Sequence, residues 1–462
     1  MHGMTLTAAP ADWEILQQKD GYAEVLLAGS YQVLPAALEV GVESVRPVAR
    51  VMREDDNSCV HPWTLLKHET NPDFTGHFSD TIRIPAGGPY RIDTSLETKS
   101  TTKNLTWLYR GDCVLHLGVG DLFIIAGQSN AAGYSRDYAP DPPCMAVHLY
   151  RNRRRWDTAS HPLNESTAAG GLPNEELGIP GVSPYLSFAK CFARQSGRPV
   201  GLIQTALGGS PLSRWLPDGD LYGNLLDRLH ETHGQYAGVL WYQGCNDTCP
   251  ENAPHYLENF TRLVSALRAE LGYPIPFFTC QLNRMVGDPN DEGWAIVREA
   301  QRQAALTLDK VYILPTTNCS LADAIHNSAA ANLVLGQKLA AQSAHYLLGA
   351  PLFEAPTLAN AVLTGPLTLR VSFNHVAVSL VVRSADNADN GFTLEDGEGE
   401  IPITMVSYGR EDRGSINLVL ARTPGPGARL SFQWRANPAP YPPVDEITCL
   451  PPLSFYRLPL SL

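Results

Sequence analysis

Five short apolar runs in the middle of the chain each end at, or shortly before, a small cluster of polar residues. The first run, Asp121–Gly127, leads directly into Gln-Ser-Asn at residues 128–130. The other four runs are Val200–Thr205, Gly238–Tyr242, Pro276–Gln281 and Val311–Leu314. Amphipathic stretches separate the runs, and this alternation is typical of a parallel α/β sheet. Ligands bind beyond the carboxyl ends of the strands in such a sheet, so we expect the polar clusters to meet at one functional edge.

The two ends of the chain have a different pattern. Residues 1–115 alternate apolar and polar side chains with a period near two and carry no long helical pattern, which favours a small antiparallel β-sandwich. The same alternation returns after Gly349, between turns rich in glycine and proline. We therefore predict an α/β domain over residues 116–350, flanked by β-sandwich-like domains over residues 1–115 and 351–462.

Charge and hydropathy argue against several classes of partner. The net charge is −12 and no long basic run is present, which argues against nucleic acid and anionic membrane surfaces as partners. No segment approaches the ~18 uninterrupted apolar residues of a membrane span. Residues 1–20 show no secretory signal, so a cytoplasmic location is the default expectation. A signal that had been removed would instead fit a periplasmic or secreted protein.

The cysteines do not form a recognisable framework. There are nine of them, an odd number for a set of disulfides. Cys245 and Cys249 form a CxxxC pair, but no second pair of cysteines or histidines lies nearby in sequence to complete a tetrahedral zinc site. We interpret the two as free thiols, with a disulfide as the alternative. We predict no metal and no other cofactor.

Ser129 is the candidate nucleophile. It stands in Gly-Gln-Ser-Asn-Ala, immediately after a strand that is expected to be buried. A serine hydroxyl becomes a good nucleophile when a neighbouring base removes its proton in the transition state. A tight turn at the end of the strand would direct the hydroxyl into the crevice where ligands bind. Most serines are structural, so the position of Ser129 and not its residue type singles it out.

The candidate base is His326, three residues after Asp323. At this spacing the carboxylate can accept a hydrogen bond from the imidazole Nδ1–H while Nε2 faces Ser129, as in a Ser-His-Asp arrangement. The alternative is that Asp323 caps the helix expected over residues 329–345 and that His326 is incidental. If His326 is the base, activity falls as it gains a proton, near the unperturbed imidazole pKa of ~6.5 unless Asp323 raises it.

Two further strand ends offer donors for an oxyanion. Gly208 and Gly209 follow the second apolar run, and a glycine lets a backbone N–H approach a substrate oxygen closely. Gln243 follows the third run, and its carboxamide can donate to the same oxygen. Together with the backbone N–H of Ser129 these groups would form an oxyanion hole, in which the loss of one donor typically costs ~10²–10³ in rate.

Five ordered segments resemble the motifs of the sialate O-acetylesterase family, which belongs to the SGNH hydrolases and is similar to the acetylxylan esterases of the same branch. The segments are AGQSNAAGY (126–134), LGGSPLSRW (207–215), WYQGCNDT (241–248), VREAQ (297–301) and DAIHNS (323–328). The resemblance implies a flavodoxin-like sheet, no metal, and deacetylation of sugar hydroxyls. It also implies that Ser129 is the nucleophile, that His326 is a base supported by Asp323, and that Gly209 and Gln243 are oxyanion donors.

The chain departs from the family at one point. Many relatives carry Glu-Ser after the Gln-Gly, where this chain has Cys245 and Asn246. The departure leaves the three catalytic candidates intact, but it affects how Gln243 and the nearby substrate pocket are held. We therefore expect it to change substrate preference and not reaction type.

Substrate contacts are less defined. Asn130, beside the nucleophile, and Arg214, after the glycine pair, are the candidates. Arg214 and the adjacent Trp215 can meet a sugar, because arginine pairs with carboxylates and tryptophan stacks on ring faces; a salt bridge and a core indole are equally expected. If the substrate is a sialic acid, an arginine must face its carboxylate. The candidates for that arginine are Arg214, Arg284 and Arg298.

The resulting hypothesis is a serine esterase that removes O-acetyl groups from carbohydrates through an acetyl-serine intermediate. A sialic acid is the first candidate substrate, and acetylxylan or another acetylated glycan is the alternative. A non-catalytic glycan-binding protein is the alternative from a different class, and the intact Ser129, Asp323 and His326 argue against it. An α/β-hydrolase is disfavoured because its nucleophile motif is GxSxG, whereas the fifth position here is Ala131. The sequence does not indicate an oligomeric state.

Overall fold

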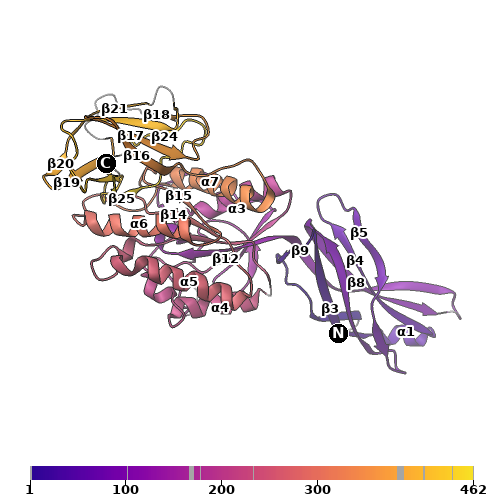
Figure 1. Cartoon of the computed structure of the whole chain (residues 1–462). Coiled ribbons are helices and arrows are strands. Elements are labelled where there is room, and N and C mark those ends of the chain that lie inside the picture. The colour runs from indigo at the N-terminus through magenta and orange to yellow at the C-terminus, as the bar shows by residue number, and fades with distance from the viewer. Residues whose placement is uncertain are drawn as a thin grey trace.

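The computed structural model describes residues 3–100, 102–165, 171–176, 178–232, 234–381, 390–408, 412–439 and 441–460. Figure 1 shows a unit of helices and strands in the middle of the molecule, with a β-rich unit on either side. Each of the three units has its own cluster of buried apolar side chains. The fold therefore has the order β-rich, α/β, β-rich that the sequence predicts.

The central sheet is parallel apart from one edge strand, β11 (Trp156–Thr158), which pairs antiparallel with its neighbour. Its parallel strands lie in the spatial order β10 (Val147–Tyr150), β12 (Val200–Gln204), β9 (Leu105–Gly127), β13 (Gly238–Tyr242), β14 (Phe277–Gln281), β15 (Val311–Pro315). Without β10, the strands numbered along the chain have the order 2-1-3-4-5, which is that of flavodoxin-like sheets. The predicted parallel sheet is confirmed.

Helices cover both faces of this sheet. Figure 1 shows α3 (Pro184–Ser196) and α7 (Ala329–Leu348) on one side and α4 (Asp220–Glu231) and α5 (Tyr256–Leu271) on the other. The helix α6 (Asp291–Thr307) packs beside α5, and the short α2 (Ser129–Ala132) begins directly after β9. With both faces covered, the strands are buried throughout, which explains why they appear as continuous apolar runs.

The N-terminal unit consists of two antiparallel sheets around a core of its own, and it also carries the short helix α1 (Pro35–Glu39). One sheet has the order β1 (Gly3–Ala8), β3 (Tyr22–Gln32), β7 (Gly76–Pro85), β6 (His68–Thr70). The other has the order β5 (Cys59–Leu65), β4 (Ser44–Arg53), β8 (Gly87–Ser100), β9. The short β2 (Ile15–Gln17) adds to β9 in parallel.

The strand β9 belongs to both the N-terminal and the central unit. It is 23 residues long, and it pairs with β8 in its first part and with β12 and β13 in its last part. The domain boundary expected at residues 115–116 therefore falls inside a continuous strand and not in a linker. Gly118 and Gly120 are packing positions within this strand: a Cβ at Gly120 would lie 1.8 Å from the carbonyl oxygen of Pro199.

The C-terminal unit has two further antiparallel sheets and one short strand pair. The first sheet has the order β16 (Thr357–Gly365), β17 (Thr368–Asn374), β22 (Ser415–Leu420), β21 (Ile403–Tyr408). The second has the order β20 (Gly399–Ile401), β19 (Phe392–Asp396), β23 (Arg429–Phe432), β25 (Phe455–Pro459). The pair is formed by β18 (Leu380–Val381) and β24 (Val444–Asp445). This unit is attached to α6 through Arg298, which donates to backbone carbonyls of residues 433–436.

Three compositional features are visible in the fold. No helix in the described ranges is long and apolar enough to cross a membrane. All nine cysteines, including Cys245 and Cys249, are unpaired. Across those same ranges, no three His, Cys, Asp or Glu side chains gather in a group that would hold a metal ion.

Candidate active site

The polar clusters that follow β9, β12 and β13 meet at the carboxyl edge of the central sheet. Hydrogen bonds continue beyond the strand ends: the N–H of Leu207 donates to the carbonyl of Gly127 at 3.0 Å, and the N–H of Gln128 donates to the carbonyl of Tyr242 at 2.9 Å. This edge lies where the order of the strands reverses around β9, which is the ligand-binding position in open α/β sheets. The convergence predicted from the sequence is therefore present.

Ser129 is the first residue of α2 and is 6% exposed. Among the residues that the structure describes, its hydroxyl has no hydrogen-bond partner. Its backbone N–H lies in the first turn of the helix, where N–H groups have no acceptor inside the helix. The preceding Gln128 is fixed on both sides of its carboxamide, since Oε1 accepts from the N–H of Gly244 at 2.9 Å and Nε2 donates to Asn246 Oδ1 at 3.1 Å. The turn thus holds Ser129 firmly and leaves its hydroxyl free to react.

Asp323 and His326 form the predicted pair. Nδ1 of His326 lies 2.7 Å from Oδ2 of Asp323, and the other carboxylate oxygen accepts the backbone N–H groups of Ile325 and His326. Burial opposes ionisation of Asp323, but the bonds from the His326 ring and the two N–H groups outweigh it and lower the pKa of the carboxyl. An ionised acceptor requires the proton on Nδ1, which leaves Nε2 without one. Nε2 has no partner in the described part of the chain.

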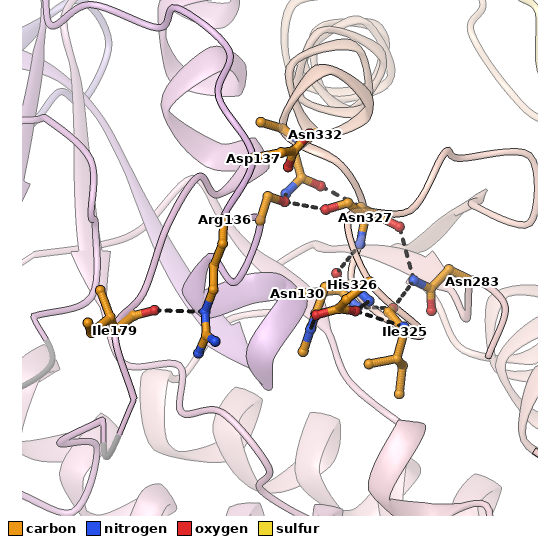
Figure 2. Close-up of polar contacts among 12 residues, drawn as sticks. Asn130, Arg136, Asp137, Ile179, Asn283, Ile325, His326, Asn327 and Asn332 are labelled. Carbon is orange, nitrogen blue, oxygen red and sulfur yellow. Dashed lines mark hydrogen bonds and ion pairs between the residues drawn. The ribbon is translucent and has the colours of Figure 1, made fainter. Parts of the chain in front are cut away.

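A set of asparagines fixes the loop that carries His326 (Figure 2). Asn130, next to the nucleophile, accepts the N–H of Asn327 at 3.0 Å and donates to the carbonyl of Ile325 at 3.4 Å. Asn283 donates to the same Ile325 carbonyl at 2.5 Å and to Asn327 Oδ1 at 3.0 Å. These bonds place His326 beside the turn of Ser129. Asn130, which we expected to contact substrate, is buried and uses its Oδ1 and one Nδ2 proton to hold the loop; its contact with substrate stays a prediction.

A buried glutamate connects the histidine to the glycine loop. The ring of Tyr134 lies over that of His326, with centroids 5.2 Å apart, and the Tyr134 hydroxyl donates to Glu176 at 2.6 Å. Glu176 also accepts the N–H of Gly208 at 2.7 Å and the Asn164 carboxamide at 2.8 Å. Burial raises the pKa of Glu176, although these bonds oppose the rise. No sequence pattern indicated Glu176, which lies 32 residues from Gly208 and 42 from Tyr134.

Gly209 has the backbone conformation and the free N–H that an oxyanion donor needs. Its φ is +67°, in the left-handed region that favours glycine. Its neighbour Gly208 is held by Glu176, whereas the Gly209 N–H has no acceptor within the described ranges. A Cβ built at Gly209 would meet nothing within 4 Å, so the N–H is beside open space. The expected role of Gly209 fits this geometry.

Gln243 does not fit its expected role. It is 0% exposed, and its carboxamide nitrogen donates to the Ser210 carbonyl at 3.1 Å and to the carboxylate of Asp247. Both neighbours are acceptors, so the NH₂ group must face them and has no proton left for an oxyanion. Gln243 instead ties the loop after β12 to the turn after β13. The sequence predicts a carboxamide at the end of the strand, but it does not show whether the NH₂ group already donates to a buried acceptor.

Asn246 is a side chain with free donors that our sequence interpretation did not consider. It is exposed, and Gln128 bonds to its Oδ1, which leaves both Nδ2 protons free. Asp247, the next residue, is buried and anchors the turn by accepting the N–H of Leu212 at 3.0 Å. The sequence signal was Asn246 followed directly by Asp247, one side chain free and the other an anchor. We had considered Asn246 only as part of a departure from the family pattern.

Two of the three arginines named as candidate substrate contacts, Arg214 and Arg298, are engaged elsewhere. Arg214 binds both carboxylate oxygens of Asp220, at 2.9 and 2.6 Å, and Trp215 is a buried core indole. Arg298 is buried and donates to the Leu282 carbonyl and to those of the C-terminal unit. The third, Arg284, is half-buried, and its Nε has no hydrogen-bond partner among the described residues.

Comparison with known proteins finds relatives of the central unit and a solved structure of similar fold. Residues 119–345 match the family model described as carbohydrate esterase, sialic acid-specific acetylesterase. A probable carbohydrate esterase of Arabidopsis thaliana is 26% identical over 243 residues, which are 47% of this chain and 88% of the plant protein. The crystal structure of a novel carbohydrate acetylesterase from Xanthomonas citri is similar in fold, with a TM-score of 0.65 at 20% identity, over 98% of this chain and 99% of that one.

Proposed function

Residues 119–345 belong to the carbohydrate esterase family of sialic acid-specific acetylesterases, the chain is a carbohydrate acetylesterase, and we propose that Ser129, His326 and Asp323 perform its reaction. The observation that carries this proposal is the Asp323–His326 bond of 2.7 Å in a loop that Asn130 fixes beside Ser129. A carboxylate on Nδ1 orients the ring and stabilises the imidazolium that forms when Nε2 takes a proton.

In the first step, the Ser129 oxygen attacks the carbonyl carbon of the acetyl ester while Nε2 of His326 removes the hydroxyl proton. The carbonyl electron pair moves onto its oxygen. The backbone N–H groups of Ser129 and Gly209 and the Nδ2 group of Asn246 donate to this oxyanion, with Asn246 in the role first expected of Gln243. The bond from carbon to the sugar oxygen then breaks, the imidazolium returns the proton to that oxygen, and the deacetylated sugar leaves.

In the second step, water takes the place of the serine as nucleophile. Nε2 of His326 removes a proton from the water as its oxygen attacks the acetyl-serine carbonyl, and the same donors hold the second oxyanion. The bond between the carbonyl carbon and the Ser129 oxygen breaks, the serine regains its proton from the imidazolium, and acetate leaves. The residues named are sufficient for both steps.

The proposed substrate within the acetylated carbohydrates is an O-acetylated sialic acid. The description of the matching family and the five ordered motifs, including Ser129 and the Asp323–His326 pair, support this choice. Acetylated xylan is the alternative that must be tested beside it, because the reacting groups act on the ester and not on the rest of the sugar.

The experiment compares wild type with Ser129→Ala in the release of acetate from 4-nitrophenyl acetate, 9-O-acetyl sialic acid and acetylated xylan. We expect Ser129→Ala to lose about 10⁴-fold or more in kcat on every substrate that wild type hydrolyses. Ser213→Ala is the matched control, because Ser213 is exposed and lies outside the proposed machinery. Equal rates for wild type and Ser129→Ala would overturn the nucleophile assignment, and release from xylan but not from the sialic acid would overturn the substrate assignment.

A further inference from the structure

Arg136 is a charged side chain near the site that the proposed reaction does not use. It is exposed, and its Nε donates to the carbonyl of Ile179 at 3.2 Å (Figure 2). In the portion of the chain with described coordinates, no carboxylate lies within ion-pair distance of it. The two terminal nitrogens of the guanidinium therefore keep their protons available for a ligand.

Tyr134 places this cation close to the proposed base. The guanidinium carbon of Arg136 lies 5.5 Å from the centroid of the Tyr134 ring, and the same ring lies 5.2 Å from that of His326. Gly178 leaves space for the side chains of Arg136 and Tyr134, since a Cβ there would lie 3.3 Å from Arg136 Nη2 and 3.3 Å from the Tyr134 hydroxyl. Arg136 is thus one side chain away from the base.

The neighbouring acid does not neutralise Arg136. Asp137 follows it directly, but its carboxylate accepts the N–H of Ala329 at 2.8 Å, at the start of α7. Glu176, the other acid near Tyr134, accepts from Tyr134, Gly208 and Asn164. A guanidinium without a carboxylate partner, beside a site for sugar esters, is suited to an anion on the substrate.

We propose that Arg136 binds a carboxylate of the acetylated sugar and that it gives the site a preference for acidic over neutral carbohydrates. This inference rests on the proposed function and names the residue that recognises the substrate. A guanidinium offers parallel N–H groups that match the two oxygens of a carboxylate. The bond to Ile179 and the contact with Tyr134 hold the side chain before the substrate arrives, so little rotamer freedom is lost on binding.

The arginines named from the sequence do not offer this arrangement. Arg214 already holds Asp220 with two bonds, and Arg298 is buried against backbone carbonyls. The third, Arg284, is half-buried with an unpartnered Nε in the described part of the chain. Arg136 differs from all three because it combines an exposed head group, open N–H donors and a contact with the side chain over His326.

The test measures acetate release from 9-O-acetyl sialic acid and from its C1 methyl ester, which differ in the charge of one carboxyl group. Wild type is compared with Arg136→Gln and with Arg153→Gln, an exposed arginine outside the site. We expect wild type to prefer the free acid by about 10- to 100-fold in kcat/KM, as a charge-assisted bidentate pair would give. In Arg136→Gln that preference should disappear, mainly through KM, while the rates on the methyl ester and on 4-nitrophenyl acetate stay within about twofold. Arg153→Gln should behave as wild type.

The outcomes separate this inference from the proposed function. Loss of the acid preference in Arg136→Gln alone supports the inference. An equal fall in the kcat/KM of Arg136→Gln on both sialic acid substrates overturns the inference, and so does an unchanged preference for the free acid in this variant. The esterase assignment stands in both cases. Wild-type release of acetate from xylan but from neither sialic acid substrate also overturns it. Turnover that survives Ser129→Ala would instead contradict the proposed reaction itself.

Discussion

On the base side of the site, Asp323 is an exposed carboxylate, whereas on the oxyanion side Glu176 and Asp247 are buried. The pKa directions differ accordingly. Burial raises the pKa of Glu176 and of Asp247, while the bonds from His326 and from two backbone N–H groups outweigh burial at Asp323 and lower its pKa. Asp323 is therefore the acid that keeps its charge most readily.

This difference indicates that the carboxylates of the site have two different roles. Asp323 faces a ring that becomes cationic during the reaction, so its charge acts on the transition state. Glu176 and Asp247 face amide and hydroxyl donors, so they act by fixing the loops that carry Gly209 and Asn246. Removing the charge of the carboxylate should therefore lower kcat on the base side. On the oxyanion side, kcat should fall when the hydrogen bonds of the carboxylate are lost, and not when its charge alone is removed.

Asp323→Asn offers the strongest contrast, because it removes the charge and keeps the shape. The remaining oxygen can still accept the N–H groups of Ile325 and His326, so the loop should keep its fold. An amide next to Nδ1 no longer requires the proton there, and we expect a fall of about 10³–10⁴-fold in kcat. The measurement is steady-state hydrolysis of 4-nitrophenyl acetate, with thermal unfolding as the control for the fold.

The pH profile sharpens the same test. Because the pKa of Asp323 is lowered, its pairing stabilises the wild-type fold above the pKa of the unfolded carboxyl and loses this effect as pH falls through the lowered folded value. Asp323 therefore stays charged between pH 5 and 8, and a loss of wild-type activity toward acid in this range reports a group other than this carboxyl. A rate independent of pH from 5 to 8 would contradict histidine as the base.

Asn246→Ala tests the donor on the oxyanion side. The side chain is exposed and contributes one bond to Gln128, so its removal should cost little stability while kcat falls by about 10²–10³-fold. In Gln243→Ala the larger effect should be on stability and not on kcat. We expect a clear loss of thermal stability, because the change removes buried bonds to Ser210 and Asp247. Full activity of Asn246→Ala in 4-nitrophenyl acetate hydrolysis would exclude Asn246 as a donor.

The sequence could predict the parts of the site that follow strands. A buried parallel strand is a continuous apolar run, and its carboxyl end is fixed by the sheet, so Ser129 and Gly209 could be placed before any coordinates. The Asp323–His326 pair is local, with the bonded side chains three positions apart in sequence, and was equally accessible. These features depend on short-range pattern and on the topology that such patterns imply.

The rest depends on contacts between distant segments. Gln243 and Asn246 carry the same functional group three residues apart, and only the position of Asp247 and Ser210 decides which one is occupied. Glu176 lies outside every strand and helix and reaches Tyr134 and Gly208 through tertiary packing. No spacing in the sequence indicated Glu176, and the occupied state of Gln243 follows from tertiary contacts, whereas the adjacent Asn246 and Asp247 were a signal that we did not use.

The smallest expected effect concerns Glu176, where shape should outweigh charge. In Glu176→Gln, the amide oxygen can still accept from Gly208 and Asn164, and the Tyr134 hydroxyl can turn to accept from the new NH₂ group, so kcat should stay within about twofold of wild type. Glu176→Ala leaves those donors without partners and frees the loop of Gly209, and we expect a loss of about 10-fold in kcat.

Stability against pH completes the comparison, because the sign at Glu176 is opposite to that at Asp323. Burial raises the pKa of Glu176, so the folded state holds the proton more tightly, and wild type should lose stability as pH rises from the unfolded carboxyl pKa through the raised folded value. Glu176→Gln has no proton to lose and should lack this fall in thermal unfolding measured between pH 5 and 8. If Gln reduced kcat as much as Ala, the charge of Glu176 would matter to the reaction, and the division of work between the two sides would be wrong.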